Sequence, residues 1–181
     1  MNRRGISSRR LLMILIGVAV GLAIAGAISF TGYATRAAPD AHRFAVAPFE
    51  IFATGLESWR LQLAGGLTTK LHAIPGWTAV PQTVIAERWQ GKERPEIAAV
   101  EVARRSTAGV AVYGRVDSLG HDSLRVHVLL IDVPTTVVTS TIELKLPRGS
   151  PDIVVDSLAA RIAATITGRQ AAGGTPPSPA R

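Results

Sequence analysis

The apolar residues of the chain recur with two different spacings, and these spacings predict strands that alternate with helices. A short apolar run at residues 44–49, bounded by turn residues, predicts a buried strand with Pro48 near its end. Between Leu56 and Ile74, apolar residues recur every three or four positions, as on one face of a helix that ends at Pro75. A β-α unit therefore opens the domain that we expect at residues 43–168.

The start and the middle of this first helix carry two further signals. Thr54 and Glu57 have the spacing of a capping box, in which each side chain accepts from a free backbone amide. Gly65 and Gly66 lie inside the helix, where each glycine lowers helix stability by about 1 kcal/mol relative to alanine. We therefore expect close backbone packing at this pair, a bend, or a helix that begins later.

Shorter elements follow in the middle of the chain. Residues 77–81 predict a second strand, and residues 82–89 predict a turn of helix after it. A loop is expected at residues 90–94, and a proline suits the first position of the helix predicted at residues 95–105. The residues of that helix expected to face a sheet are Ile97, Val100 and Ala103.

Strand-like alternation dominates the next part of the chain. Residues 109–116, 124–133 and 137–146 predict three strands that form an antiparallel meander. In the middle strand, one face is expected to hold Val126, Val128 and Leu130, and the other Arg125, His127, Leu129 and Ile131.

A last helix is predicted after the meander. Ser150 and Pro151 are typical of a helix start, and Gly168 suits the C-terminal cap. The apolar positions between them step by three and four, at Val155, Leu158, Ile162 and Ile166. The predicted fold class is α/β (α+β), with a mixed β-sheet of about five strands packed by about three helices and preceded by one transmembrane helix.

Residues 11–33 predict that transmembrane anchor. Leu11 to Phe30 is apolar or glycine at every position except Ser29, and a helix of that length spans the roughly 30 Å hydrocarbon core of a bilayer. Residues 1–10 hold four arginines and no acid, so the positive-inside rule places them in the cytoplasm. We therefore expect a single-pass protein of the bacterial inner membrane whose C-terminal domain is periplasmic.

The competing interpretation of this segment is a cleaved signal peptide. Residues 32–34, Gly-Tyr-Ala, form a passable cleavage site, but the apolar run exceeds the about 7–15 residues of a typical signal-peptide core. We favour an uncleaved anchor, and both interpretations export the domain. Gly17, Gly21 and Ala25 share one helix face and can allow a weak homodimer, although small residues are also simply common in membrane helices.

Composition narrows the function classes. The chain has 181 residues and no cysteine, which excludes disulfides, thiolate metal sites and cysteine nucleophiles. Most of its net charge of +7 lies in the two ends, because residues 42–168 hold 13 Lys and Arg against 12 Asp and Glu, a net charge of +1. A nearly neutral domain argues against nucleic acid as a partner. A linker is expected at residues 34–42 and a disordered Gly/Pro/Ala-rich tail at residues 169–181.

We assign no catalytic, cofactor-binding or metal-ligating residue in this sequence. The phosphate-binding, dinucleotide, zinc-protease and serine-hydrolase motifs do not occur. Asp117, His121 and Asp122 could hold a cation, and ordinary turn chemistry is the alternative. Asp122 and Arg125 could form a surface ion pair.

Five charged or aromatic positions remain to be interpreted as structure or as a partner surface. The pair Arg104-Arg105 has the composition of a solvated helix end. Core or rim packing is expected for Trp59, Trp77 and Trp89, and an exposed one of them would instead mark a partner surface.

An ordered set of partial motifs resembles the TolB amino-terminal-type domain, in the group that includes FlgO-like and CsgG-like envelope domains. The matching segments are residues 44–49 (Phe-Ala-Val-Ala-Pro-Phe), 66–71 (Gly-Leu-Thr followed by Leu), 73–77 (Ala-Ile-Pro-Gly-Trp), 112–116 (Val-Tyr-Gly-Arg-Val), 120–126 and 130–132. The family's tryptophan-containing last strand is replaced here by Val137-Val138-Thr139-Ser140.

The resemblance implies a non-catalytic accessory domain without catalytic residues or cofactors. It favours a membrane-anchored periplasmic module that binds an envelope protein partner. The alternative is an extracytoplasmic small-molecule or ion sensory domain of a signalling system, which needs a concave pocket with converging polar groups.

Overall fold

The structure is a computed structural model that describes residues 38–89 and 94–173. Several predictions lie outside these residues: the basic end at 1–10, the anchor at 11–33 with its small face of Gly17, Gly21 and Ala25, and nearly all of the loop at 90–94. Within the described ranges, none of the helices combines the length and the hydropathy that a membrane crossing requires.

Six strands form one mixed sheet in the order β3-β1-β4-β5-β6, and the short β2 pairs with β4 beyond the end of β1. The strands are β1 (Asp40–Val46), β2 (Glu50–Ile51), β3 (Thr78–Ala79), β4 (Ala108–Ser118), β5 (Ser123–Asp132) and β6 (Val137–Pro147). β1 runs parallel to β3 and β4, whereas β4, β5 and β6 form the predicted antiparallel meander, which is confirmed.

The sheet has one strand more than the approximately five predicted, because the first strand is built in two halves, β1 and the short β2, and β2 lies just after the predicted run 44–49. Pro48 has no backbone N–H to donate and lies between β1 and β2. The amide of Ala47 before it still donates to the carbonyl of Val112 at 2.9 Å, and the amide of Phe52 after it donates to Val116 at 2.8 Å. Both halves therefore follow β4.

Four helices lie in the described part of the chain: α2 (Trp59–His72), α3 (Gln82–Arg88), α4 (Pro95–Arg105) and α5 (Pro151–Gly173). The predicted start of α4 at its proline is confirmed. The start of α5 is confirmed as well, because the Ser150 hydroxyl accepts from the amide of Asp152 at 3.1 Å. The predicted turn of helix after the second strand is α3.

The capping box predicted at Thr54 and Glu57 does not form, because α2 begins only at Trp59. The Glu57 carboxylate instead accepts from the amide of Gly55 at 3.0 Å, within the turn before the helix. Backbone hydrogen bonds from Glu57 and Gly55 lower the pKa of the Glu57 carboxyl. Gly65 and Gly66 still lie inside α2, so a helix start after the glycine pair, one of the three expected outcomes, does not occur.

Both boundaries of the domain lie further out than predicted. β1 begins at Asp40, inside the expected linker 34–42, since the amide of Asp40 donates to the carbonyl of Thr107 at 2.9 Å. α5 passes Gly168 without capping there and reaches Gly173, inside the tail expected at 169–181. The added residues 169–172, Arg-Gln-Ala-Ala, all have high helix propensity.

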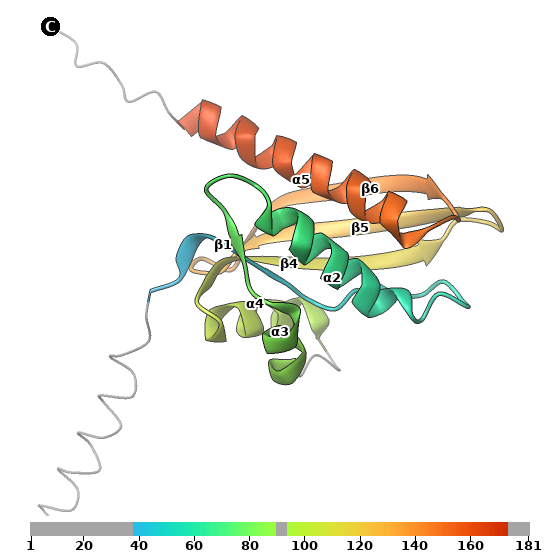
Figure 1. Cartoon of the computed structure of the whole chain (residues 1–181), viewed down its shortest axis with the longest axis horizontal. Helices are drawn as coiled ribbons and strands as arrows, with labels where there is room; N and C mark the ends of the chain where they lie inside the picture. The colour runs from blue at the N-terminus through green and yellow to red at the C-terminus, as the bar shows by residue number, and fades with distance from the viewer. Residues whose placement is uncertain (1–37, 90–93, 174–181) are drawn as a thin grey trace, which may run out of the picture. The chain divides into compact units, whose positions relative to one another are not determined.

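The helices divide between the two sides of the sheet, with α2 and α5 on one side and α3 and α4 on the other (Figure 1). We call these sides the α5 face and the α4 face. Because strand residues alternate between faces, Phe44 and Val46 of β1 belong to the core under α2 and α5, whereas Ala45 belongs to the core under α3 and α4.

The α5 face holds the larger core. The strand residues predicted for one face of β5, Val126, Val128 and Leu130, are buried there. The predicted apolar residues of the two covering helices are also buried, namely Trp59, Leu63, Leu67 and Leu71 of α2 and Val155, Leu158, Ile162 and Ile166 of α5. Gly66 allows α2 to approach α5, since a Cβ at this position would lie 3.0 Å from the Val155 side chain. Close packing is therefore confirmed at Gly66, whereas a Cβ at Gly65 would meet no atom within 4 Å.

A second close approach joins β4 to the segment after β1. The ring of Phe49 is fully buried and lies over Gly114, where a Cβ would come within 2.3 Å of it. Any larger residue at Gly114 would displace this ring. The Pro-Phe motif at the end of the first apolar run and the Tyr-Gly-Arg motif of β4 are thus two halves of one packing contact.

Candidate functional site

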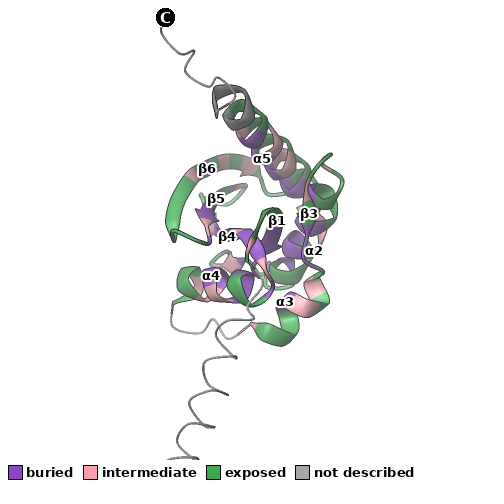
Figure 2. Ribbon diagram, turned by 90° about the vertical axis from the view of Figure 1, so that its left-hand side faces the viewer, coloured by how far each residue is buried: buried purple, intermediate pink, exposed green. Residues whose placement is uncertain are grey.

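The α4 face of the sheet is covered only in part. Helix α4 packs on β4 and β1, and the outer strand β6 is exposed along most of its length (Figure 2). Beyond the helix, this face carries an ion pair between Arg125 of β5 and Glu143 of β6, whose nitrogen and oxygen are 3.4 Å apart. The part of the face between α4 and this charged pair is apolar.

A groove of about 400 Å³ occupies that apolar part. Ile97 and Val100 of α4 form one wall, and Leu129 and Ile131 of β5 form the floor. Val138 of β6, with Thr136 of the preceding turn, forms the opposite wall. Ile97 and Val138 are 53% and 47% exposed, and the neighbouring Val137 is 57% exposed. The groove therefore presents several large aliphatic side chains to solvent.

A β-bulge turns Val138 into this groove. The pairing of β5 with β6 shifts between Leu130 and Ile131, so that Ser140 lies opposite Leu130 but Val138 lies opposite Ile131. The extra residue, Thr139, donates from its hydroxyl to the carbonyl of Leu130 at 3.0 Å. A regular ladder would place Thr139 opposite Ile131 and would give the groove a hydroxyl in place of the valine.

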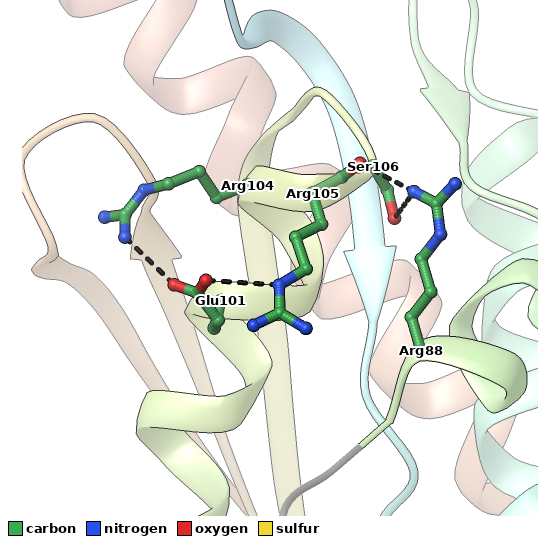
Figure 3. A network of polar contacts seen from close by, with 5 residues as sticks. All are labelled: Arg88, Glu101, Arg104, Arg105 and Ser106. Carbon is green, nitrogen blue, oxygen red and sulfur yellow. Dashed lines mark hydrogen bonds and ion pairs between the residues drawn. The ribbon is translucent and has the colours of Figure 1, made fainter. Parts of the chain in front are cut away.

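Charged residues of α4 line one rim of the groove. Glu101 lies between two arginines, with its oxygens 3.2 Å from Arg104 and 3.2 Å from Arg105 (Figure 3). Glu96, in the first turn of the same helix, also lines the groove and forms no ion pair with any residue of the described chain. The rim therefore offers one carboxylate that is not neutralised by a neighbour.

The expectation that Ile97 faces the sheet is wrong. The α4 residues that face it are Ala99, Val100, Val102 and Ala103, which are all buried. Ile97 lies toward the open side, at the edge of the area that the helix covers. Periodicity identifies the helix, but it cannot distinguish an apolar residue under the helix from one at its border.

A polar pair of one buried and one half-buried residue lies on the same face of the sheet. The Tyr113 hydroxyl donates to the Glu50 carboxylate, and the tyrosine is 7% exposed. Burial raises the pKa of the Tyr113 phenol most, and the hydrogen bond and the negative charges of Glu50 and Glu96 raise it further. The phenol is therefore a proton donor that fixes β2 on β4 at neutral pH, not a base.

The residues considered for a cation site do not assemble into one. Asp117 pairs with Arg115 at 3.1 Å, and residues 38–89 and 94–173 contain no group of three His, Asp or Glu residues placed to hold a metal ion. The suggested pair between Asp122 and Arg125 is also replaced, because Arg125 contacts Glu143 across the strands.

The tryptophans pack as core and rim residues, as predicted. Trp59 is 7% exposed, Trp77 is half-buried and stacks on Phe44 with ring centroids 4.5 Å apart, and Trp89 packs partly against the core under α4. The pair Arg104-Arg105 forms the last turn of α4 and is exposed, which confirms a solvated helix end.

Comparisons with known proteins find similar structures but no similar sequences. No protein-family model matches the chain. No curated protein matches it either. Among solved structures, the LpoB C-terminal domain from Salmonella enterica matches with a TM-score of 0.50 and 13% identity, over 60% of this chain and 84% of that one.

Two further solved structures are similar. Lipoprotein GNA1162 from Neisseria meningitidis has a TM-score of 0.50 and 14% identity, over 70% of this chain and 96% of that one. TolB from Acinetobacter baumannii has a TM-score of 0.48 and 18% identity, over 74% of this chain but only 30% of that one. At these identities the likeness to the LpoB domain and to GNA1162 concerns the fold alone, and it agrees with the α/β fold that the sequence resemblance implies.

Proposed function

We propose that the chain is a membrane-anchored, non-catalytic interaction module of the bacterial cell envelope and that a protein partner binds its α4 face. The observation that carries the proposal is the groove between α4 and β6, where Ile97 and Val138 expose aliphatic surface and the neighbouring Val137 is exposed as well. Exposed apolar surface of this kind is unfavourable for a monomer in water and is typical of a binding site.

The chemistry of the groove describes the partner segment. Its floor and walls are aliphatic, so the segment presents aliphatic side chains. The Glu96 carboxylate at the rim favours a lysine or arginine on the same segment, because an opposite charge at the rim steers the approach. We infer an amphipathic peptide segment with a basic flank, bound in the manner of a helix in a groove.

The envelope location is inferred from the sequence and from the fold. The predicted anchor at residues 11–33 exports the domain with the N-terminus in the cytoplasm. The structural likeness to a lipoprotein and to the LpoB domain supports the same assignment. No catalytic residue, cofactor or metal enters the proposed role.

The location is tested by adding protease to spheroplasts of cells that express the full chain with a C-terminal epitope. The proposal expects loss of the epitope while a cytoplasmic marker protein persists. An epitope that stays protected until the spheroplasts are lysed would contradict export.

The partner site is tested with a pair of matched variants. Ile97→Glu places a charge in the groove, and Ile153→Glu places the same charge at an isoleucine of α5 with nearly the same exposure, 51% against 53%. Co-purification from membranes is expected to recover an envelope protein with the unaltered chain and with Ile153→Glu, but not with Ile97→Glu. Equal recovery with both variants would place the partner elsewhere.

One observation favours the alternative, an extracytoplasmic small-molecule sensor. A cavity of about 180 Å³ opens on the α5 face, with Phe44 and Trp77 on one side, Ile166 on another and His42 at its edge. Aromatic walls with a polar edge suit a small ring compound. A thermal-shift screen separates the two functions, because a ligand that binds the folded chain raises its melting temperature.

A further inference from the structure

A second concave site lies between α3, the end of α4 and the starts of β1 and β4. It is a cleft of about 270 Å³, lined by the three arginines Arg43, Arg88 and Arg105, by the hydroxyl residues Ser106 and Thr107, and by Val80 and Val84. Arg43 comes from β1, Arg88 from α3 and Arg105 from α4, so three separate elements bring positive charge to one place.

The positive charge of the cleft is not neutralised within the described chain. Of the three arginines, only Arg105 has a carboxylate partner, Glu101, and that carboxylate is shared with Arg104 (Figure 3). Arg43 and Arg88 form no ion pair with any described residue. Like charges gathered in a concave site raise the local potential and attract an anion.

Hydrogen bonds hold two of the guanidinium groups at the cleft and leave most of their donors available. Arg88 uses Nη1 alone, which lies 2.6 Å from the carbonyl oxygen of Arg105 and 3.5 Å from the Ser106 hydroxyl. Arg43 likewise uses Nη1, which donates to the Thr107 hydroxyl at 3.2 Å. Because a guanidinium carries five N–H donors, each group keeps donors that a ligand can use.

Capping of α4 accounts for only part of this arrangement. Cations near the end of a helix are favourable, and this explains why Arg88 lies against the last carbonyls of α4. It does not explain Arg43, which lies on β1 and reaches Thr107, one residue past the helix cap. Thr107 has a φ of +55°, a conformation that is unfavourable for a β-branched residue.

We propose that this cleft binds a phosphate ester. Guanidinium groups donate two parallel hydrogen bonds to phosphate oxygens, and hydroxyl groups such as those of Ser106 and Thr107 can add to them. Val80 and Val84 give the cleft an apolar side that fits the organic part of the ester. The site is separate from the groove of the proposed function and does not depend on it.

A phosphate ester could reach the cleft from two sources. One is a soluble metabolite, and the other is the headgroup of an anionic lipid. The lipid source is relevant because Arg43 follows the end of the predicted anchor, residue 33, by only ten residues.

The full chain in nanodiscs of phosphatidylcholine tests the site, with glycerol 3-phosphate as the probe and calorimetry as the measurement. Arg105→Gln and Arg104→Gln are matched variants, since both arginines pair with Glu101 at 3.2 Å but only Arg105 lines the cleft. We expect Arg43→Gln and Arg105→Gln each to weaken binding by about tenfold or more, the effect of one charge-assisted hydrogen bond. Arg104→Gln should change it by less than about twofold, because salt screens an exposed charge.

Adding phosphatidylglycerol to the nanodiscs distinguishes the sources. If a lipid headgroup is the ligand, phosphatidylglycerol occupies the cleft and blocks the binding of glycerol 3-phosphate. If the ligand is soluble, glycerol 3-phosphate binds equally well in both kinds of nanodisc. Either result supports the site. Absence of glycerol 3-phosphate binding to the unaltered chain in phosphatidylcholine discs would overturn the proposal. Equal weakening of glycerol 3-phosphate binding by all three variants would also overturn the proposal, because the probe would then be attracted by the positive charge of the surface in general and not by the cleft. Thermal unfolding of each variant checks that it is folded.

Discussion

The two faces of the sheet are built from the same strands but differ in the size of their side chains and in how far they are covered. On the α5 face, α2 and α5 bury residues as large as Phe44, Leu63 and Leu158. On the α4 face, α4 covers mainly alanine and valine and leaves the apolar groove beside β6 open. The larger core therefore lies on the α5 face, whereas apolar surface stays exposed on the α4 face.

The difference originates in the alternation along the central strands. Phe44 and Val46 point to the α5 face, and Ala45 and Ala47 point to the other. Small side chains let α4 lie close to β1 and β4, but a helix so placed does not extend over β6. The small residues that let α4 pack closely on β1 and β4 therefore leave β6, at the border of this face, exposed.

The largest expected effect on stability is a cavity in the α5 face. Leu158→Ala should lower the free energy of unfolding by about 2–5 kcal/mol, since Leu158 is fully buried and its removal leaves a void. Val102→Ala on the α4 face should lower it by about 1–3 kcal/mol, because fewer buried carbons are lost. Urea unfolding measures both, and an equal or larger loss for Val102→Ala would contradict the comparison.

The contact between Gly114 and Phe49 should give the next largest effect. Gly114→Ala forces the new Cβ against the Phe49 ring and should lower stability by about 1–3 kcal/mol. The double variant Gly114→Ala/Phe49→Leu, in which the smaller leucine replaces the phenyl ring, should be less destabilised than the sum of the two single variants. Simple additivity in a urea double-mutant cycle would show that the two residues do not share a contact.

Tyr113 gives a smaller effect that depends on pH. At neutral pH, Tyr113→Phe should lower stability by about 1–2 kcal/mol through loss of the hydrogen bond to Glu50. Because the fold raises the phenol pKa above its ordinary value of 10.0, the stabilisation by Tyr113 is complete below pH 10 and falls as the pH rises further. Urea unfolding across this range should show a steeper alkaline loss for the unaltered chain than for Tyr113→Phe. An equal loss of stability with rising pH in both chains would contradict the raised pKa of the Tyr113 phenol.

The smallest effect on stability is expected in the groove itself. Ile97→Ser and Val138→Thr should each change the free energy of unfolding by less than about 0.5 kcal/mol, because both side chains are about half exposed. Thermal unfolding checks this. A loss as large as that of a core substitution would indicate that these residues support the fold and are not kept for a partner.

Much of the α5 face could be predicted from the sequence, because regular periodicity produces it. Alternation in β5 identified Val126, Val128 and Leu130, and the spacing of three and four identified Leu158 and Ile162 in α5. These residues repeat one local rule over many positions. No knowledge of their neighbours was needed.

The groove could not be predicted, since each of its features depends on a neighbour or on an irregularity. Ile97 follows the period of α4, and only the position of β6 decides that it is exposed. Val138 faces the groove because Thr139 is an extra residue in the ladder, and nothing in the local sequence marks that bulge. The charged cleft is similar, because Arg43, Arg88 and Arg105 are far apart in the sequence and meet only through the topology of the sheet.

The account depends most on the claim that the α4 face, and not the α5 face, binds a partner in the envelope. The direct measurement is photo-crosslinking in living cells, with a photoreactive amino acid placed at Val138 in one strain and at Ile153 of α5 in another, both about half exposed. The account predicts a discrete adduct with an envelope protein from Val138 and none from Ile153. The same adduct from both positions, or an adduct from Ile153 alone, would contradict it.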